Sequence, residues 1–519
     1  MKRILSLVLA MLLMLGLSSA VAEEVEPVTL TMFSVQAPIQ GPWEDMLFFQ
    51  EMEKITGVSW EFDLVDSSTL PERKALLLGS GDLPDVLMGA NLSEAELLQY
   101  GSMGAFLPLE DYINEETMPN LTAFLEANPE YRTMMTSSDG HIYSLIGVSA
   151  CPRDYVAAKS WVNKEWLEAL DLEVPTTVDE YYDMLVAFKN GDPNGNGEND
   201  EIALSFATDG NVMIGTFRTF MLAAYGVVTS NGGNGDMYLD GEGNVQYVFT
   251  SDAYKAYLEF AHKLYAEGLL DNECFSQAGN QLVAKGNQSL IGNFFCLASY
   301  LVDTTENYPK YDSIAPLTSE MNDTPMAPQN WLGSTGVYAV SSTCKDPEAA
   351  LRWVDYLYSS EGGILLSQGP EGYGWDYIDD TRTYWDKNVP EGYASSEEYR
   401  GTITPNCGTG TPGYVDPDFA LHLNAAHVID LEEHTAKSYT PYLTQGYPKV
   451  KLSEEDTETA NTYYTDISKY VESCEARFIS GDMGLDQWDA YVENLQSMNL
   501  DAYVQIFVDA YADYQAMAG

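Results

Sequence analysis

The chain has 519 residues, of which 45% are hydrophobic and 12% aromatic, and its 79 acidic against 25 basic residues give a net charge of −54. This apolar content is that of a globular protein, and it excludes an intrinsically disordered acidic chain. The length predicts two or three domains. A surface this negative repels phosphate backbones, so we exclude nucleic acid as a partner.

The N-terminus has the three parts of a secretory signal peptide. Lys2 and Arg3 precede an apolar run over residues 4–17, and residues 18–22 end in an A-x-A cleavage pattern. The run is too short to span a bilayer comfortably. We therefore predict that the signal peptide, residues 1–22, is removed and that the mature protein is exported and soluble, in the periplasm or outside the cell. A buried N-terminal helix is the less favoured alternative.

Strands and helices alternate in the first part of the mature chain. The pattern predicts strands over 28–35, 58–64 and 84–88, and helices over 44–56 and 71–79. Gly57 ends the first helix, and Ser93 with Glu96 forms a capping box for a further one. Alternation of this kind predicts parallel strand pairing and an α/β domain.

The pattern starts anew in a second block, which ends in helices, and the chain has no internal repeat. Thr177 with Glu180 forms another capping box. Further helices are predicted over 251–267, over 346–358 and from 456 onward. The sequence therefore predicts a two-lobed α/β protein with a helical C-terminal region.

Several kinds of chemistry lack their motifs. Six scattered cysteines form no C-x-x-C pair, which excludes zinc-ribbon and thioredoxin-type sites; one or two disulfides stay open. Three histidines (His422, His427 and His434) lie close together but have no H-x-x-x-H spacing, so a polar helix is favoured over a metal site. The chain also has no G-x-S-x-G nucleophile motif and no glycine-rich phosphate loop.

The sharpest local pattern is an acidic, glycine-containing loop. Side-chain oxygens alternate from Asp192 to Asn196 as they do at the start of an EF-hand loop, and Gly197 stands at the sharp-turn position. Ala203 replaces the bidentate glutamate of an EF-hand. The loop is therefore either a compact structural calcium site of another kind, which we favour, or a polar turn. The predicted calcium ligands are Asp192, Asn194, Asn196, the carbonyl of Glu198, Asp200 and Glu201.

Aromatic residues are abundant, with 35 Tyr and 9 Trp. Their flat faces stack on sugar rings, and the alternative for each of them is an ordinary place in the core or on the surface. Eight candidates for ligand binding are Trp43, Tyr143, Trp161, Phe294, Phe295, Trp331, Trp375 and Tyr414.

Five motifs, in order along the chain, resemble those of family 1 extracellular solute-binding proteins, which deliver ligands to ABC importers. They are Ser80–Asp85 (S-G-D-L-P-D), Asp139–Tyr143 (D-G-H-I-Y), Lys164–Tyr182, the loop Asp192–Glu201, and Phe478–Tyr491. The chain is most similar to the long oligosaccharide-binding branch that includes alginate-oligosaccharide binders. The resemblance implies the same calcium ligands in the loop and, as the nearest stacking candidates, Trp161, Phe294, Phe295, Trp375 and Tyr414.

Two departures from the family pattern stand out. The end of the apolar N-terminal run has no lipobox cysteine, so the resemblance leaves the retention of the protein at the cell envelope unexplained. Glu165 stands where the family usually has Asp before Trp-Leu, which is a mild change.

The resemblance implies a two-lobed, hinge-closing fold that holds an oligosaccharide between its lobes and presents it to ABC permease subunits. We expect a monomer that carries out no bond chemistry. The expected lobes are 23–150 with part of 300–360, and 151–299 with part of 361–455, followed by a helical region over 456–519. The chain would cross the hinge near 145–155 and again near 297–303.

The net charge favours a neutral sugar over a polyanionic one, although a local cluster of Arg153, Lys159 and Lys164 would reverse that preference. Two alternatives stay open. One is a secreted glycan-acting enzyme, which needs a pair of carboxylates in the cleft. The other is a surface glycan receptor without a transport partner.

Overall fold

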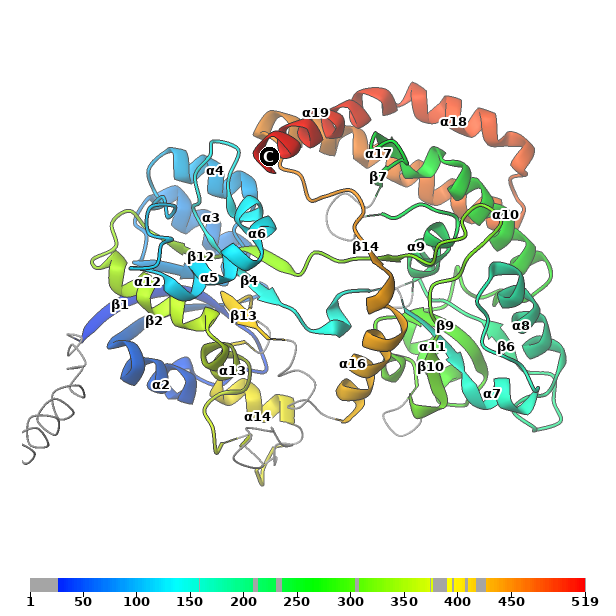
Figure 1. Cartoon of the computed structure of the whole chain (residues 1–519), viewed down its shortest axis with the longest axis horizontal. Helices are drawn as coiled ribbons and strands as arrows, with labels where there is room; N and C mark the ends of the chain where they lie inside the picture. The colour runs from blue at the N-terminus through cyan, green and yellow to red at the C-terminus, as the bar shows by residue number, and fades with distance from the viewer. Residues whose placement is uncertain are drawn as a thin grey trace, which may run out of the picture.

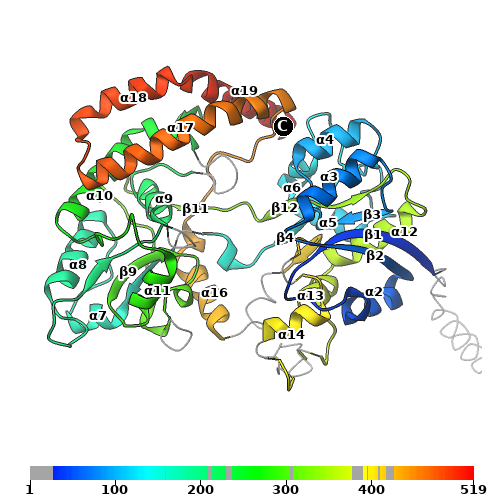
Figure 2. The same cartoon turned by 180° about the vertical axis from the view of Figure 1, so that it is seen from behind.

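A computed structural model describes residues 27–157, 159–208, 213–229, 236–303, 308–373, 375–376, 390–393, 396–406, 409–416 and 426–518. The predicted signal peptide, residues 1–22, lies outside the described residues. Two lobes are visible, each built on its own sheet, with a group of C-terminal helices lying across the second lobe (Figures 1 and 2). None of the helices in the described part of the chain combines the length and the apolar character needed to cross a membrane.

The first lobe contains a six-stranded sheet. In spatial order its strands are β13 (Gly413–Val415), β4 (Leu145–Ser149), β12 (Gly333–Val340), β3 (Val86–Met88), β1 (Val28–Gln36) and β2 (Val58–Asp66). β1 is parallel to β2 and β3, β12 is antiparallel to β3 and β4, and β13 is parallel to β4. The parallel pairing predicted for the first strands is therefore confirmed.

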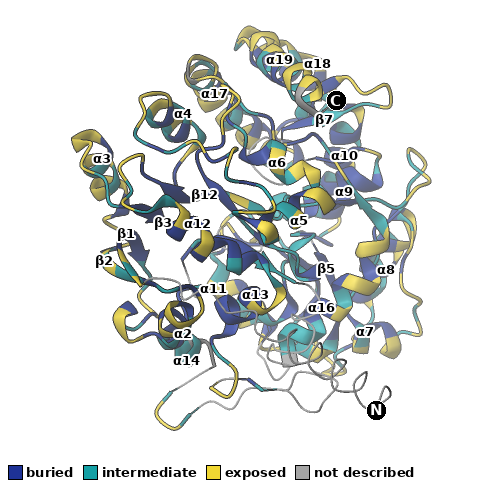
Figure 3. Ribbon diagram, turned by 60° about the vertical axis from the view of Figure 1, so that its left-hand side comes forward, coloured by how far each residue is buried: buried dark blue, intermediate teal, exposed yellow. Residues whose placement is uncertain are grey.

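Both faces of this sheet are buried, as parallel sheets require. Along β1, Leu30 and Met32 enter one core, whereas Phe33 and Val35 enter the other, because successive side chains of a strand point to opposite faces. Figure 3 shows the same contrast, with buried strands and exposed outer sides of the helices. The helices of this lobe are α2 (Leu47–Thr56), α3 (Leu70–Ser80), α4 (Glu94–Ser102), α5 (Pro119–Ala127), α6 (Pro129–Met135), α12 (Pro347–Asp355), α13 (Ser360–Gln368) and α14 (Ser396–Ile403).

The second lobe contains a four-stranded sheet. Its spatial order is β10 (Tyr311–Ser313), β5 (Lys159–Asn163), β9 (Ile291–Cys296) and β6 (Ile202–Leu204). β5 is antiparallel to both of its neighbours, and β6 is parallel to β9. The helices are α7 (Lys164–Ala169), α8 (Val178–Asn190), α9 (Ile214–Ala224), α10 (Asp252–Ala266), α11 (Gly279–Gly286) and α16 (Ala426–Ser438).

The C-terminal helical region is present as predicted and packs on the second lobe through α10. Glu475 is buried there and accepts hydrogen bonds from the Arg218 guanidinium at 2.5 Å and the Tyr257 hydroxyl at 2.9 Å. The helices of this region are α17 (Glu454–Ser480), α18 (Trp488–Ser497) and α19 (Leu500–Ala518).

Short elements complete the fold. Two small pairs of strands are β7 (Met237–Leu239) with β8 (Val245–Tyr247) and β11 (Ala327–Pro328) with β14 (Leu443–Thr444). The 3-10 turns are η1 (Trp43–Asp45), η2 (Pro152–Asp154), η3 (Val248–Thr250), η4 (Ser299–Leu301), η5 (Tyr308–Lys310), η6 (Tyr356–Tyr358), η7 (Thr440–Tyr442) and η8 (Leu485–Gln487).

Cap residues fold as the sequence predicts. Gly57 takes the left-handed conformation, with φ of 72°, at the end of α2. Both capping boxes form, with Ser93 and Glu96 at α4 and with Thr177 and Glu180 at α8. All five cysteines among the described residues are free thiols, and four of them are buried; Cys407 lies outside the described residues.

The chain passes between the lobes first after β4, then between β10 and β12, and a third time between β13 and α16. The first passage, through η2, agrees with the crossing expected near 145–155. A crossing near 297–303 is not what the structure has, because Tyr311 to Ser313 still pair with β5 in the second sheet. The division of the whole chain into lobes stays a prediction.

A buried lysine supports the first passage. Lys159 is 0% exposed, and its ammonium group donates hydrogen bonds to the carbonyl of Arg153 at 2.8 Å and to that of Val156. Burial lowers the pKa of Lys159 to about 8, because the charged form loses its hydration. The protein therefore keeps the Lys159 ammonium group buried directly behind the crossing segment, although the loss of hydration is unfavourable for its charged form.

We predict that replacing Lys159 by Met changes the pH dependence of stability. The unfolded lysine has a pKa of about 10.4, so between pH 8 and pH 10.4 the unfolded state binds more protons and wild-type stability rises with pH. Relative to Lys159→Met, the wild type should gain up to about 3 kcal/mol of unfolding free energy across that range. Urea unfolding of both proteins at pH 7 and pH 10 measures the gain. An equal difference at both pH values would contradict the prediction.

Candidate functional site

A cavity of about 560 Å³ lies where the two lobes meet. Most of its wall comes from the first lobe, and Arg153, Tyr300, His427 and Val428 form the wall on the side of the second lobe. The first-lobe residues are Gly147, Val148, Ser149, Leu332, Ser334, Leu366, Ser367, Gln368, Arg400, Asn406, Thr409, Gly410, Thr411, Gly413 and Val415.

The first-lobe wall depends on close packing of β4 against the segment that leads into β13. A Cβ atom on Gly147 would lie 2.1 Å from the carbonyl oxygen of Thr411, so only glycine permits this approach. The Thr411 hydroxyl donates to the Asn406 side-chain oxygen at 2.8 Å, and Arg400 donates to the carbonyl of Ser367 at 2.9 Å. Side chains of different segments thus form one polar wall.

A buried glutamine fastens the same segment to β1. The Gln40 amide donates to the carbonyl of Pro405 at 2.6 Å and to the Thr409 hydroxyl at 3.0 Å, and that hydroxyl donates to the carbonyl of Val35 at 2.9 Å. The indole N–H of Trp43 donates to the Gln40 side-chain oxygen at 3.1 Å. Trp43 therefore supports the cavity wall from behind.

The second-lobe wall is held by a buried carboxylate. Glu432 on α16 accepts the backbone N–H of Arg153 and its guanidinium Nη1, both at 2.6 Å. The rings of Tyr300 and His427 meet edge to face with centroids 4.6 Å apart. This contact joins η4 to the N-terminal end of α16.

The cavity is rich in hydroxyl, amide and guanidinium groups. Among the described residues that line it, the ionisable side chains are Arg153, Arg400, Tyr300 and His427, and none is Asp or Glu. Burial raises the pKa of Tyr300 above its ordinary value, so its hydroxyl remains a neutral donor and acceptor. Such a wall can bind a polar, hydroxyl-bearing molecule through many hydrogen bonds.

Five of the aromatic candidates are core side chains. Trp43, Tyr143, Trp161, Phe294 and Phe295 are at most 2% exposed, so as placed they offer no face on which a sugar could stack. Trp161, for example, donates to the carbonyl of Cys296 within the second lobe. Because aromatic residues carry the largest apolar surface, burial in a core is their commonest fate.

The other three candidates also lie outside the cavity lining. Trp375 is 6% exposed and donates to the carbonyl of Gly369 at 2.9 Å. Trp331 borders a separate small pocket, and Tyr414 packs against Phe124 with centroids 4.9 Å apart. None of the eight is brought to the cavity in this structure, and their contact with a ligand stays a prediction. Sequence reasoning did not select Tyr300, His427 or Arg400, which no local motif marks.

The predicted calcium loop lies between α8 and β6 and brings its oxygen-bearing side chains together. The amides of Asn194 and Asn196 donate to the Asp200 carboxylate at 3.0–3.1 Å, and the backbone N–H of Gly197 donates to Asp192. Gly197 has φ of 79°, which explains the glycine at this turn. Within the described residues no group of three or more His, Cys, Asp or Glu side chains is arranged as a metal site.

One loop carboxylate lacks a hydrogen-bond partner. Both side-chain oxygens of Glu201 are buried without a partner among the described atoms. Burial raises the pKa of Glu201, and the negative charges of Asp200 and Asp192 add to this effect, which outweighs the lowering influence of the backbone N–H groups of Glu201 and Asp200. An unpaired carboxylate beside a set of oxygen donors fits a hard cation better than it fits a simple polar turn.

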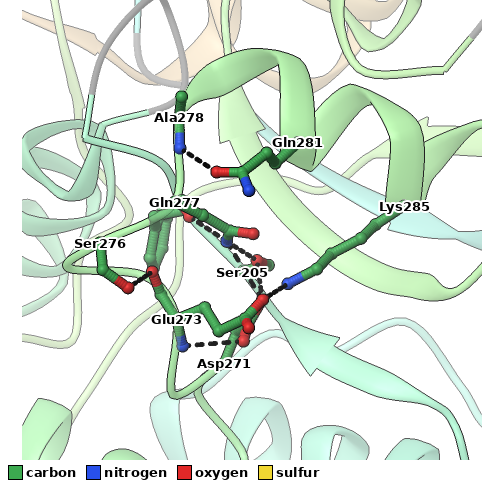
Figure 4. Close-up of polar contacts among 9 residues, drawn as sticks. Ser205, Asp271, Glu273, Ser276, Gln277, Ala278, Gln281 and Lys285 are labelled. Carbon is green, nitrogen blue, oxygen red and sulfur yellow. Dashed lines mark hydrogen bonds and ion pairs between the residues drawn. The ribbon is translucent and has the colours of Figure 1, made fainter.

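A polar cluster fastens the strand that follows this loop. The Ser205 hydroxyl donates to the Asp271 carboxylate at 2.7 Å, and Lys285 donates to Asp271 at 2.8 Å and to Glu273 at 2.7 Å (Figure 4). Burial raises the pKa of Asp271, but Lys285 and the hydrogen bonds outweigh this effect and hold the pKa below its ordinary value. The cluster therefore anchors the end of β6, and none of its residues lines the cavity.

Comparison with known proteins agrees with this architecture. The sequence profile of the bacterial extracellular solute-binding proteins matches residues 34–364. The fructooligosaccharide ABC transporter substrate-binding protein FusA of Streptococcus pneumoniae serotype 4 is 31% identical over 509 residues, which cover 95% of this chain and 91% of FusA.

Solved structures share the fold. The S. pneumoniae FusA structures in complex with kestose and, as an EF-hand mutant, with fructo-nystose each have a TM-score of 0.71 at 27% and 26% identity, covering 94% of this chain and 100% of theirs. Alginate-binding protein AlgQ2 without calcium ion has a TM-score of 0.65 at 22% identity, with 94% and 98% coverage. The family match and the FusA similarity establish a binding protein and not an enzyme, and the chain belongs to the bacterial extracellular solute-binding protein family.

Proposed function

We propose that this chain captures an oligosaccharide in the cavity between its lobes and delivers it to the permease subunits of an ABC importer. The observation that carries the proposal is the composition of the cavity, whose hydroxyl, amide and guanidinium groups come from both lobes. Its volume of about 560 Å³ is in the range of small-molecule sites. The similarity to FusA, a fructooligosaccharide-binding protein, supports the same ligand class.

The proposed mechanism of ligand capture follows from the fact that both lobes contribute side chains to the cavity wall. A ligand that contacts Arg400 on the first lobe and Tyr300 on the second gains its full set of hydrogen bonds only when the lobes are close together. Binding therefore favours the closed arrangement in proportion to those additional contacts. The permease would recognise the closed, loaded form.

We predict that a neutral oligosaccharide raises the melting temperature of the mature protein. A ligand at a hundred times its Kd adds about 2.7 kcal/mol of stability when it binds only the folded state. A thermal-shift panel of kestose, nystose and neutral gluco-, galacto- and manno-oligosaccharides measures the effect. Chromatography of the recovered sugars should show that they are unchanged, because shortened products would favour the glycan-acting enzyme instead.

Tyr300→Ala gives the matched variant for this panel. It removes an aromatic face and a hydroxyl from the cavity, so the sugar-dependent shift, measured from the variant's own sugar-free melting temperature, should shrink; the lost ring contact with His427 lowers that sugar-free melting temperature. Tyr373→Ala is the control, because Tyr373 is 54% exposed and lies outside the cavity lining. No shift with any sugar would overturn the proposal.

We further propose that the loop over residues 192–201 holds a structural Ca²⁺. Asp192, Asn194, Asn196, the carbonyl of Glu198, Asp200 and Glu201 are the residues that would supply oxygen ligands. The unpaired, buried carboxylate of Glu201 supports the proposal, as does the description of a FusA variant as an EF-hand mutant. A bound cation would fix the turn between α8 and β6.

We predict that chelation destabilises the protein. Calcium at a hundred times its Kd should raise the melting temperature by about 3 °C for a chain of this size. Differential scanning calorimetry with calcium, with EGTA and with magnesium measures this effect. In Glu201→Gln the response to calcium should be greatly reduced, whereas in Glu198→Gln, which keeps the backbone carbonyl, it should persist. A wild-type protein indifferent to EGTA would show that the loop is a polar turn.

Export and transport partnership complete the proposal. The N-terminal pattern supports cleavage after Ala22 and function outside the cytoplasm. That the mature protein is a monomer associated with the cell envelope is part of the same proposal. The alternative of a surface glycan receptor without a transport partner differs in its genomic setting. Adjacent genes for two permease subunits would favour the importer.

A further inference from the structure

Arg153 holds a charge at the point where the crossing segment reaches the cavity. Its side chain is 26% exposed and lines the cavity, while its Nη1 and its backbone N–H both bind Glu432. The Glu432 side chain is 0% exposed. Both oxygens of this carboxylate are thus engaged by one residue, and the pair is shielded from solvent on the carboxylate side.

A second carboxylate and a second cation complete this group. Asp154 lies 3.8 Å from the Arg153 Nε atom, is 35% exposed, and accepts the Ser149 hydroxyl at 3.0 Å. Lys159 lies behind the segment and binds the carbonyl of Arg153 at 2.8 Å. Two positive and two negative groups therefore surround the same stretch of backbone, and their charges cancel.

The structure shows that the three basic residues noted in the sequence, Arg153, Lys159 and Lys164, do not form one positively charged cluster in the cavity. Lys164 lies 3.3 Å from Asp312 on β10 and is not among the cavity residues. Lys159 is fully buried behind the wall. Of the three cations, only Arg153 faces the cavity, and it does so with its charge matched by Glu432. The guanidinium can donate hydrogen bonds to a ligand without presenting a net positive charge.

We propose that Glu432 is a specificity-determining residue: it balances the charge of Arg153, so that the cavity selects neutral, hydroxyl-rich sugars over sugars that carry carboxylates. This inference rests on the proposed oligosaccharide-binding function. A carboxylate on the ligand would compete with Glu432 for the same guanidinium, and it would meet Glu432 and Asp154 at short range. Unlike-charge and like-charge interactions over a few ångströms in a partly buried site change affinity by large factors.

Glu432→Gln tests the inference by removing the balancing charge at nearly constant volume. Titration calorimetry would compare a neutral trisaccharide that binds the wild type with trigalacturonate, an acidic sugar of the same length. The ratio of the neutral to the acidic Kd should increase by about tenfold in Glu432→Gln. Glu433→Gln is the matched control, because Glu433 is exposed and changes the net charge of the chain equally. Its ratio should equal that of the wild type.

Two further variants separate charge from structure. In the double variant Arg153→Gln with Glu432→Gln, the ratio should return towards the wild-type value, because the Arg153 cation that Glu432 balances is removed together with it. Asp154→Asn provides the same test at a more exposed position, should Glu432→Gln fail to fold. It keeps an acceptor for Ser149 and should move the ratio in the same direction by a smaller factor.

The outcomes distinguish this inference from the function on which it rests. An equal loss of affinity for both sugars in Glu432→Gln, or an unchanged ratio in a folded Glu432→Gln, would make Glu432 a structural residue and overturn the inference alone. A wild type that binds trigalacturonate more tightly than the neutral trisaccharide would also overturn it while leaving oligosaccharide binding intact. A wild type that binds neither these two sugars nor any sugar of the panel would overturn the proposed function and the inference together.

Discussion

The structure depends on how the chain is held where it passes between two lobes that have separate hydrophobic cores. Each sheet is covered on both faces by its own helices, whereas the first crossing segment adds only Val156 and the partly buried Tyr155 to the core of the second lobe. Hydrogen bonds and charges therefore contribute much of the order of this segment. The Glu432 carboxylate and the Lys159 ammonium meet this need by binding the N–H and C=O of Arg153.

The cavity is a consequence of the same arrangement. Polar wall groups can face an open space there because they are positioned from behind by buried partners, as Gln40 positions Thr409 and as Glu432 positions Arg153. Rigid support of this kind lowers the ordering cost of binding, which is what makes a set of modest hydrogen bonds useful for affinity. The supporting residues are as much a part of the site as the residues that line it.

The sequence predicted those features that depend on local patterns. The patterns of apolar and polar residues predicted the strands β1 and β2, and the capping residues predicted the starts of α4 and α8. The spacing of oxygen-bearing side chains and glycines identified the loop over 192–201, in which Asn194 and Asn196 bind Asp200 in the structure. Each of these signals is contained within about ten residues. The motif order also identified the family, which the comparisons confirm.

The cavity could not be predicted in the same way. Its lining combines Ser149, Tyr300, Arg400 and His427, which come together only through the order of the strands and the passages between the lobes. The aromatic candidates failed to reach it for a physical reason: Trp43 and Trp161 contribute more by filling a core than they would at a solvated wall. The second crossing was misplaced because the pairing of β10 with β5, a long-range antiparallel contact, leaves no mark in the local sequence.

The free thiols described above lie in different parts of the two lobes, so the reactivity of each thiol reports on the local stability of its own part. Cys274 and Cys474 lie in the main core of the second lobe, Cys344 packs against a core of the first, and Cys151 stands at the start of η2. Burial raises the pKa of Cys151 to about 11 and that of Cys274 to about 12, so these sulfurs stay protonated and unreactive in the native state. Alkylation of the buried Cys151, Cys274 and Cys474 must then wait for a local opening event, whereas the half-buried Cys344 is more accessible. The rates at the buried cysteines would separate fluctuations of the second lobe from those of the segment that joins the lobes.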